Sequence, residues 1–131
     1  MIVLDTHVLI WYLDNPSLLS TAARRAIDAA IQAQAIFYSQ ISLWEIAMLA
    51  HRGRIQFKIE PEQWLQNLQK LPLFTPVGIT AEIASHSVRL PDPFPGDPAD
   101  RIIAATSLHL NFPLVTRDEA IRKSTLVRTI W

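Results

Sequence analysis

The stretch Ile2-Val3-Leu4-Asp5 is a short apolar run, Ile2–Leu4, followed at once by an acid. An apolar run of this length predicts a strand that is buried on both faces of a sheet. Later in the chain, Pro113–Asp118 (PLVTRD) also places an acid shortly after an apolar run. Both acids would then follow the carboxyl ends of parallel strands, where α/β proteins bind their ligands.

The rest of the chain alternates between strand-like and helix-like segments. The predicted strands are Ile2–Leu4, Ala35–Ser39, Leu73–Val77, Pro113–Thr116 and Leu126–Ile130. The predicted helices run from Ser20 or Thr21 to about Gln34, over Ile41–His51 with a stop at Gly53, from Glu60-Pro61-Glu62 onwards, and over Thr80–Arg89, Ala99–Leu110 and Asp118–Lys123. This alternation predicts an α/β protein whose mostly parallel sheet is covered on both faces.

Composition fits one compact domain over residues 1–131, because half of the residues are apolar and no repeat or linker interrupts them. The absence of cysteine excludes disulfides and thiol nucleophiles. No secretory signal and no apolar run long enough for a bilayer are found, so a cytoplasmic protein without membrane contact is expected. The net charge of zero is unusual for a protein that binds nucleic acid, unless divalent cations neutralise several of the acids.

Four carboxylates from separate segments are expected at one edge of the sheet: Asp5, Glu45, Asp100 and Asp118. Asp5 and Asp118 follow strands, and each has an alternative interpretation as the cap of the next helix. Asp100 lies at the start of a helix that would run antiparallel to the strands. Glu45 lies one turn into a helix with apolar neighbours, where a charged group needs a partner or a metal.

The segment Asp97-Pro98-Ala99-Asp100 has a strong structural explanation. It is typical of a helix start, with Asp97 as the N-cap, Pro98 at the first helical position and Asp100 as a capping-box acid. Asp97 is therefore treated as a cap or a supporting residue, whereas Asp100 can cap the helix and still offer one oxygen to a ligand.

Clustered carboxylates repel one another and favour Mg²⁺ or Mn²⁺, which prefer oxygen ligands. The four histidines lack metal-ligand spacing, and no serine or cysteine nucleophile motif is present. Metal-assisted hydrolysis of a phosphodiester is the chemistry that remains. Arg101 and Arg117 are candidates for phosphate contacts or are ordinary surface charges, and Trp11, Trp44 and Trp64 are expected in the core.

Four motifs in register resemble PIN-domain proteins, in particular VapC-type toxins of bacterial toxin–antitoxin pairs. They are LDTHVLIWYL (Leu4–Leu13), SLWEIA (Ser42–Ala47), DPADRIIAA (Asp97–Ala105) and PLVTRD (Pro113–Asp118). The resemblance implies a three-layer α/β/α fold with Asp5, Glu45, Asp100 and Asp118 as Mg²⁺ ligands, for which Mn²⁺ can substitute. It also implies that Thr6 and Thr116 orient acids or water.

The same resemblance implies an endoribonuclease that acts on RNA, forms a homodimer and is blocked by a cognate antitoxin protein. Apolar helices around Ile10-Trp11 and Trp44–Met48 are expected to supply the surfaces for the antitoxin and a second copy, unless they are simply core. One alternative is a catalytically silent PIN-like module that binds RNA or protein. Another is a haloacid-dehalogenase-like phosphatase, but His7 stands where that family needs a second Asp.

Overall fold

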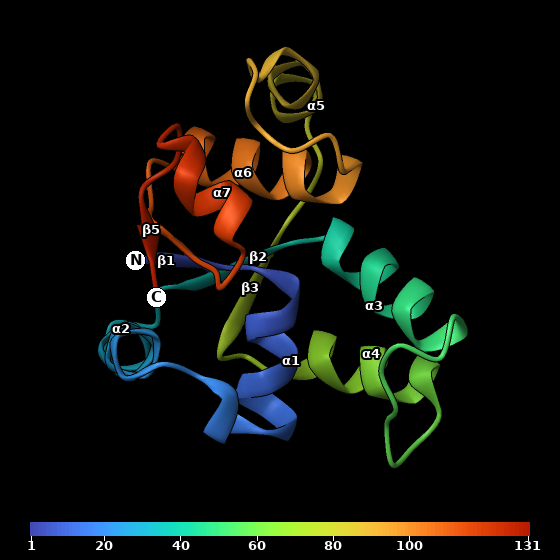
Figure 1. Ribbon diagram of the computed structural model, residues 1–131. Coiled ribbons are helices and arrows are strands. Elements are labelled where there is room, and N and C mark those ends of the chain that lie inside the picture. Colours follow the sequence, from blue (N-terminus) through green and yellow to red (C-terminus); the bar gives the residue numbers. More distant parts are fainter.

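A sheet of five parallel strands forms the middle of the molecule (Figure 1). The computed structural model describes residues 1–131. The spatial order is β3-β2-β1-β4-β5, and the strands are β1 Ile2–Leu4, β2 Ile36–Ser39, β3 Phe74–Val77, β4 Leu114–Val115 and β5 Thr129–Ile130. In the central strand, Val3 pairs with Phe37 on one side and Leu114 on the other. A strand in this position is covered on both faces, which explains why β1 contains no polar residue.

Helices cover both faces of the sheet, and successive residues of β1 enter two different cores. The helices are α1 Thr6–Asp14, α2 Thr21–Gln32, α3 Ile41–His51, α4 Pro61–Lys70, α5 Ala81–Arg89, α6 Pro98–Leu110 and α7 Glu119–Ser124, with a 3-10 turn at Pro16–Leu18. Ile2 and Leu4 pack with apolar residues of α1, α2 and α4. Val3 packs on the opposite face with residues of α6 and α7. Figure 1 shows α1, α2 and α4 below the sheet and α5 to α7 above it.

The helices α3 and α2 end in the same left-handed turn, but only the end of α3 was predicted. Gly53 follows α3 with φ +69°, and Arg54 N donates to Leu49 O at 2.9 Å, as in a Schellman motif. Gln34 follows α2 with φ 51°, and Ala35 N donates to Ala30 O at 3.0 Å. The helix predicted to reach about Gln34 therefore stops at Gln32, because a non-glycine residue adopts the conformation that usually indicates glycine.

The predicted α/β class and the α/β/α layering are confirmed. The main addition is α1, which the sequence indicated only as a helix around Ile10-Trp11. The last two strands are shorter than predicted, because the ladder between β4 and β5 pairs only Leu114 with Thr129 and Val115 with Ile130. None of the helices combines the length and the apolar character that crossing a membrane would require.

Several element ends bring acids to the carboxyl edge of the sheet. β1 leads directly into Asp5, the N-cap of α1, and β4 leads through Thr116 to Asp118, the N-cap of α7. The helix α6 starts at the same edge with Asp97 as its N-cap. The parallel order of the strands thus places these helix starts around one hollow.

Candidate active site

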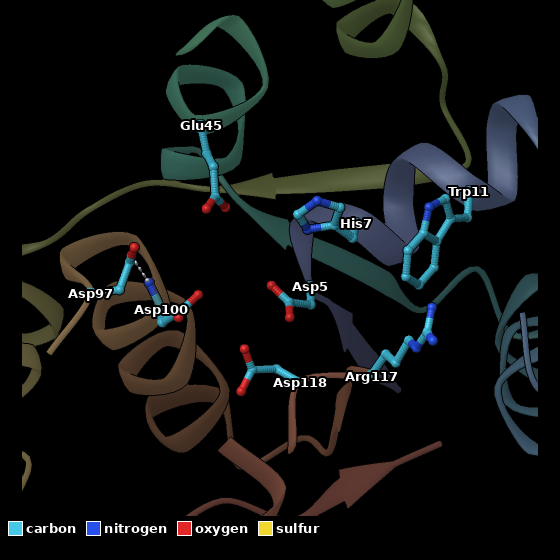
Figure 2. A pocket seen from close by; sticks show the side chains of 8 residues that line it. All are labelled: Asp5, His7, Trp11, Glu45, Asp97, Asp100, Arg117 and Asp118. Carbon is cyan, nitrogen blue, oxygen red and sulfur yellow. Dashed lines mark hydrogen bonds between the residues drawn. The ribbon is translucent and has the colours of Figure 1, made fainter. Parts of the chain in front are cut away.

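An open pocket of about 400 Å³ lies at this edge of the sheet (Figure 2). Its lining contains the four predicted acids together with Asp97, and three further residues on one side. The lining residues are Asp5, His7, Trp11, Glu45, Asp97, Asp100, Arg117 and Asp118. The structure therefore brings all four predicted carboxylates into one site, and their assignment as metal ligands stays a prediction.

Asp5 is fixed by two hydrogen bonds on the floor of the pocket. Its Oδ1 accepts from Thr6 N at 2.8 Å, and its Oδ2 accepts from Thr116 Oγ1 at 2.6 Å. Only 8% of the residue is exposed. Burial raises the pKa of Asp5, and the hydrogen bonds from Thr116 and Thr6 oppose this rise. Asp5 is thus both the cap of α1 and a carboxylate of fixed orientation at the pocket.

Thr116 connects Asp5 to Asp118. While its hydroxyl donates to Asp5, it accepts a hydrogen bond from Asp118 N at 3.0 Å. Asp118 Oδ1 accepts from Ile121 N at 2.9 Å and so caps α7. Thr116 thus contacts both acids, and its role in orienting them stays a prediction.

Thr6 lies between Asp5 and α3, and its orienting role stays a prediction. Its hydroxyl lies 2.9 Å from Ser42 Oγ, which ties the start of α1 to α3, the helix that carries Glu45. Burial raises the pKa of Glu45, and the nearby Thr6 hydroxyl lowers it. Thr6 therefore supports Glu45 from below, and it contacts Asp5 only through its backbone N–H.

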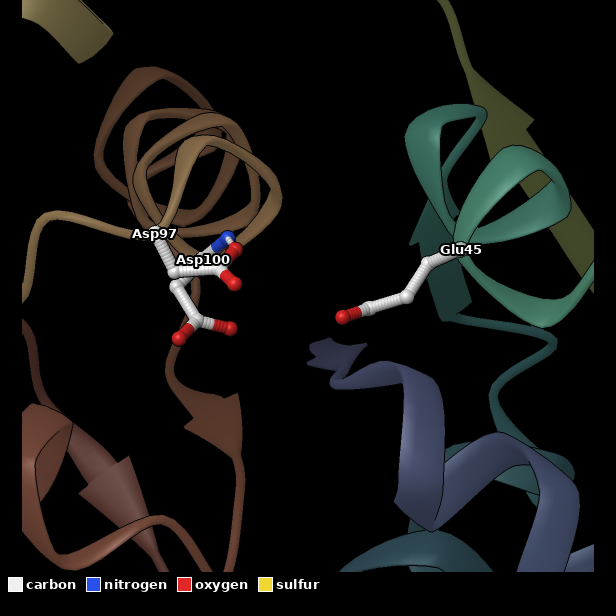
Figure 3. Close-up of side chains that lie close together, drawn as sticks. All are labelled: Glu45, Asp97 and Asp100. Carbon is white, nitrogen blue, oxygen red and sulfur yellow. Dashed lines mark hydrogen bonds between the residues drawn. The ribbon is translucent and has the colours of Figure 1, made fainter. Parts of the chain in front are cut away.

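Glu45, Asp97 and Asp100 form a group on the other side of the pocket from the hydrogen bonds that hold Asp5 (Figures 2 and 3). Each offers one carboxylate oxygen, and these oxygens lie within 4.8 Å of one another. Glu45 is buried, Asp100 is half-buried and Asp97 is exposed. Asp97 Oδ1 also accepts from Asp100 N at 3.1 Å, which is the predicted cap of α6.

The pKa of Asp100 is raised far above its ordinary value. Burial, followed by the charges of Asp5, Asp97, Glu45 and Asp118, raises the pKa of Asp100 to about 8. The structure shows no hydrogen bond to its carboxylate that would offset these effects. Like charges this close are stable together only if one takes up a proton or if a cation binds between them.

The donor set fits a divalent metal ion. Every candidate ligand is a carboxylate oxygen, which is the type that Mg²⁺, Mn²⁺ and Ca²⁺ prefer over softer ligands. Glu45, Asp97 and Asp100 are already close enough to share one ion. A bound cation would remove the repulsion that otherwise raises the pKa of Asp100.

Comparison with known proteins agrees with this geometry. The sequence matches the PIN domain family over residues 2–125. The chain belongs to the PIN-domain family. It is 41% identical to Ribonuclease VapC22 of Mycobacterium tuberculosis (strain ATCC 25618 / H37Rv) over 132 residues, which cover 99% of this chain and 98% of that protein. The predicted resemblance to PIN-domain proteins is thereby confirmed.

Solved structures share the PIN fold at much lower identity. DNA-bound VapBC from Salmonella typhimurium matches with a TM-score of 0.71 and 18% identity, covering 98% of this chain and 95% of that chain. VapBC2 from Rickettsia felis, bound to a DNA fragment from its promoter, matches with a TM-score of 0.70 and 15% identity, covering 98% and 97%. FitAcB from Neisseria gonorrhoeae has a TM-score of 0.69 and 20% identity, covering 98% and 96%. These likenesses establish the fold.

Three side chains lie in environments that differ from those predicted from the sequence. Trp44 was expected in the core, but 57% of it is exposed, whereas Trp64 is buried as expected. Trp11 is only half-buried and lines the pocket. Arg101, a candidate for phosphate contact, donates instead to the carbonyls of Ser87, Leu90 and Phe94 at 3.0–3.3 Å and so holds the loop before α6.

His7 was assigned to packing or to the surface, and it is exposed but lines the pocket. One signal in the sequence was available. His7 and Trp11 lie four residues apart in a helix that Asp5 caps, so they share a face close to the acid. Because the sequence did not give the bounds of this helix, the shared face of His7 and Trp11 could not be predicted.

Proposed function

We propose that this PIN domain is a Mg²⁺-dependent endoribonuclease and the toxin component of a type II toxin–antitoxin pair. The observation that carries the proposal is the pocket in which Asp5, Glu45, Asp100 and Asp118 converge with Asp97. The name of the relative VapC22, a ribonuclease, supports the same reaction. We further propose that residues 1–131 act as one domain and that the activity is cytoplasmic, since its substrate is cellular RNA.

We assign the metal to Glu45 and Asp100 on one side of the pocket and to Asp5 and Asp118 on the other, with Mn²⁺ as a substitute. When bound, the ion supplies activation of a water molecule and neutralises charge on the scissile phosphate. Thr116 holds Asp5 in one orientation, so its carboxylate does not need to reorganise during the reaction. Glu45 lies in the buried part of α3, beside Ser42, whose Oγ lies 2.9 Å from the Thr6 hydroxyl.

Cleavage of RNA in the presence and absence of metal tests the proposal. The purified protein should cleave single-stranded RNA with Mg²⁺ or Mn²⁺, stop after addition of EDTA and recover when excess Mg²⁺ is restored. Full activity after exhaustive chelation would contradict the metal mechanism. Binding of RNA without cleavage under any metal condition would favour the silent PIN-like module, and release of phosphate from small phosphomonoesters would favour a phosphatase.

We also propose a cognate antitoxin and a second copy of the chain as partners. The solved structures that resemble this chain include a toxin–antitoxin complex from Klebsiella pneumoniae, which supports this class of partner. Of the apolar segments expected to serve as interfaces, Ile10 belongs to the core, whereas Trp44 on α3 remains accessible. We therefore place a partner contact at Trp44.

Expression in bacteria separates these partner proposals from the nuclease. The wild type expressed alone should arrest growth, and Asp5→Asn should not, although it should still capture an antitoxin encoded beside it. If the wild type is harmless at high expression and no partner co-purifies from its native host, the toxin proposal fails. Size-exclusion chromatography with light scattering then tests the homodimer directly.

A further inference from the structure

One wall of the pocket is aromatic and cationic instead of acidic. His7 and Trp11 lie one turn apart on α1, and the centroids of their rings are 5.7 Å apart. The guanidinium carbon of Arg117 lies 5.7 Å from the centroid of the Trp11 ring. Figure 2 shows this wall directly beside Asp5, with Trp11 and Arg117 facing each other. The metal chemistry proposed above uses none of these groups.

Arg117 is exposed and forms no ion pair, although five carboxylates line the same pocket. The ion pairs of the structure are His109 with Glu82 and Lys123 with Glu119. Figure 2 shows the guanidinium directed toward Trp11 and away from the acids. Its N–H groups therefore remain available to an anion that enters the pocket, and their planar fork matches a phosphate.

Trp11 is held in place while part of its ring stays open to the pocket. The ring of Trp131 lies 5.9 Å away at an angle of 54°, so the indole is supported by a second aromatic side chain. Trp11 is half-buried, and it lines the same hollow as Asp5 and Asp118. A fixed aromatic face beside a free cation is the arrangement on which single-stranded nucleic acids stack their bases.

We propose that Trp11 and Arg117 form a platform for one nucleotide of the RNA. The unpaired base stacks on Trp11, and its phosphate contacts Arg117. This nucleotide lies next to the scissile phosphate, which lies over the acids. The proposal rests on the proposed function for the presence of RNA, and it adds the part of the substrate that binds beside the scissile bond. Trp11 and Arg117 are positioning residues in this scheme. They fix the register of the strand, and the carboxylates cleave it.

The platform has a consequence for the kind of RNA that is bound. A base inside a duplex has both faces covered by its neighbours, so only an unpaired base can lie on the Trp11 ring. Binding by charge alone would favour the duplex, because its charge density is higher. A preference for single strands therefore separates stacking on Trp11 from general attraction to phosphate.

Fluorescence anisotropy with a labelled single-stranded RNA 10-mer in EDTA tests the proposal without requiring cleavage. Trp11→Ala should weaken binding by about 5- to 150-fold, which corresponds to the loss of one stacked base, and Trp11→Phe should retain most of the affinity. Arg117→Ala should reduce the slope of log affinity against log salt concentration by about one, which corresponds to the loss of one phosphate contact. Arg25→Ala, which removes an exposed charge on α2, is the matched control and should bind like the wild type.

A scan of abasic positions along the 10-mer provides a test that does not depend on the folding of a variant. One abasic position should weaken binding to the wild type about as much as Trp11→Ala does. The same abasic RNA should bind to Trp11→Ala with no further loss, because both changes remove the same contact. The RNA annealed to its complement should bind more weakly than the single strand.

Equal affinity of Trp11→Ala and the wild type, an abasic scan without a sensitive position, or tighter binding of the duplex would each overturn the platform. These failures can be told apart from failure of the nuclease. Cleavage that depends on Mg²⁺ with no effect of Trp11→Ala on binding or KM leaves the nuclease and removes the platform. Absence of cleavage with the abasic and Trp11→Ala effects intact supports the platform and removes the nuclease.

Discussion

On the β1–β4 side of the pocket, hydrogen bonds hold the carboxylates, whereas on the α3–α6 side the carboxylates mainly face one another. Asp5 accepts from a backbone N–H and from the hydroxyl of Thr116, which also accepts from Asp118 N. Across the pocket, oxygens of Glu45, Asp97 and Asp100 lie within 4.8 Å of one another (Figure 3). The first side is ordered without a metal, and the second is stable only when one of its acids takes up a proton or when a cation binds.

This difference suggests a division of work between the two sides. The ordered side fixes the carboxylate of Asp5, a proposed ligand, before any ion binds, as supporting hydrogen bonds do in metal sites generally. On the repelling side, binding of the proposed ion would remove the like-charge repulsion. Changes on the two sides should therefore have different consequences for cleavage and for stability.

The largest effect is expected on the ordered side, from Asp5→Asn. Asn keeps the shape and one hydrogen-bond acceptor but removes the charge of a proposed ligand. Since losing a supporting partner already costs about 10- to 100-fold, loss of the ligand itself should reduce cleavage by at least about 100-fold. Thermal unfolding without metal should show unchanged or slightly higher stability, because one repulsive charge is lost.

Asp28→Asn, an exposed change on α2, is the matched control and should leave cleavage intact. A large loss of metal-free stability in Asp5→Asn, with cleavage per folded molecule unchanged, would mean that Asp5 is only the cap of α1. The hydrogen-bonded side of the pocket would then have no part in cleavage through Asp5.

Thr116→Val should have the next largest effect, because it keeps the shape of the side chain and removes the hydroxyl that joins Asp5 to Asp118. We expect cleavage to fall by about 10- to 100-fold and the pKa of Asp5 to rise further, since this hydrogen bond lowers it. Thr116→Ser should restore most of the activity. Thr106→Val is the matched control, because it removes a buried hydroxyl that bonds only within α6, to Ile102 O. Equal activities of Thr116→Val and Thr106→Val would contradict an orienting contribution of Thr116.

Much of this arrangement could be predicted from the sequence, because a strict rule connects the elements. Strands that alternate with helices run parallel, and their carboxyl ends share one edge, so the pattern of elements alone places Asp5 and Asp118 together. The capping motif at Asp97 likewise fixed the start of α6 to within one residue. Local rules of this kind do not depend on the packing of distant segments.

Exposure and long-range contacts could not be predicted in the same way. The helix α3 carries apolar residues on nearly all of its faces, so the periodicity of the sequence could not show that Trp44 faces solvent. Arg101 bonds to three carbonyls that only the folded loop before α6 brings together. The end of α2 at Gln32 was predicted about two residues too late, because the left-handed Gln34 leaves no pattern in the sequence.

On the repelling side, the predicted effect is a dependence of metal-free stability on pH. The pKa of Asp100 is about 8 in the folded protein, against an ordinary value of 3.8. Between these values the folded protein holds a proton that the unfolded chain releases, so stability is greatest near the lower value and falls as the pH rises through 8. Because Asp100 is partly exposed, solvent reduces the effect to about 1 kcal/mol, or about 3–6 °C in Tm.

Thermal unfolding in EDTA at pH 5 and pH 8 measures this dependence. Asp100→Asn should flatten it and raise the Tm at pH 8, because the variant has no charge to bury. Added Mg²⁺ should stabilise the wild type at pH 8 and have little effect on Asp100→Asn. Stability of the metal-free wild type that rises from pH 5 to pH 8 would show that repulsion on this side is not significant.

The smallest effect is expected from Asp97→Asn, which tests whether this exposed residue belongs to the charged group or only caps α6. Asn caps a helix about as well as Asp, so the variant removes the charge and keeps the hydrogen bond to Asp100 N. The pKa of Asp100 should fall, because Asp97 is one of the charges that raise it, and burial should keep it above its ordinary value. Since Asp97 is exposed, water weakens its attraction to a divalent ion, and we expect a loss of Mn²⁺ affinity of only about 5- to 10-fold.

Asp97→Ala separates the two functions, because it removes the charge and the cap together. It should lose the same metal affinity as Asp97→Asn and, in addition, about 1 kcal/mol of stability. Calorimetric titration with Mn²⁺ and NMR titration of the Asp100 carboxyl carbon measure the charge, and thermal unfolding measures the cap. If Asp97→Asn binds Mn²⁺ like the wild type and leaves the pKa of Asp100 unchanged, while Asp97→Ala loses only stability, then Asp97 is a cap. The repelling side would then consist of Glu45 and Asp100 alone, and a bound ion would depend on Asp5 and Asp118 for its remaining protein ligands.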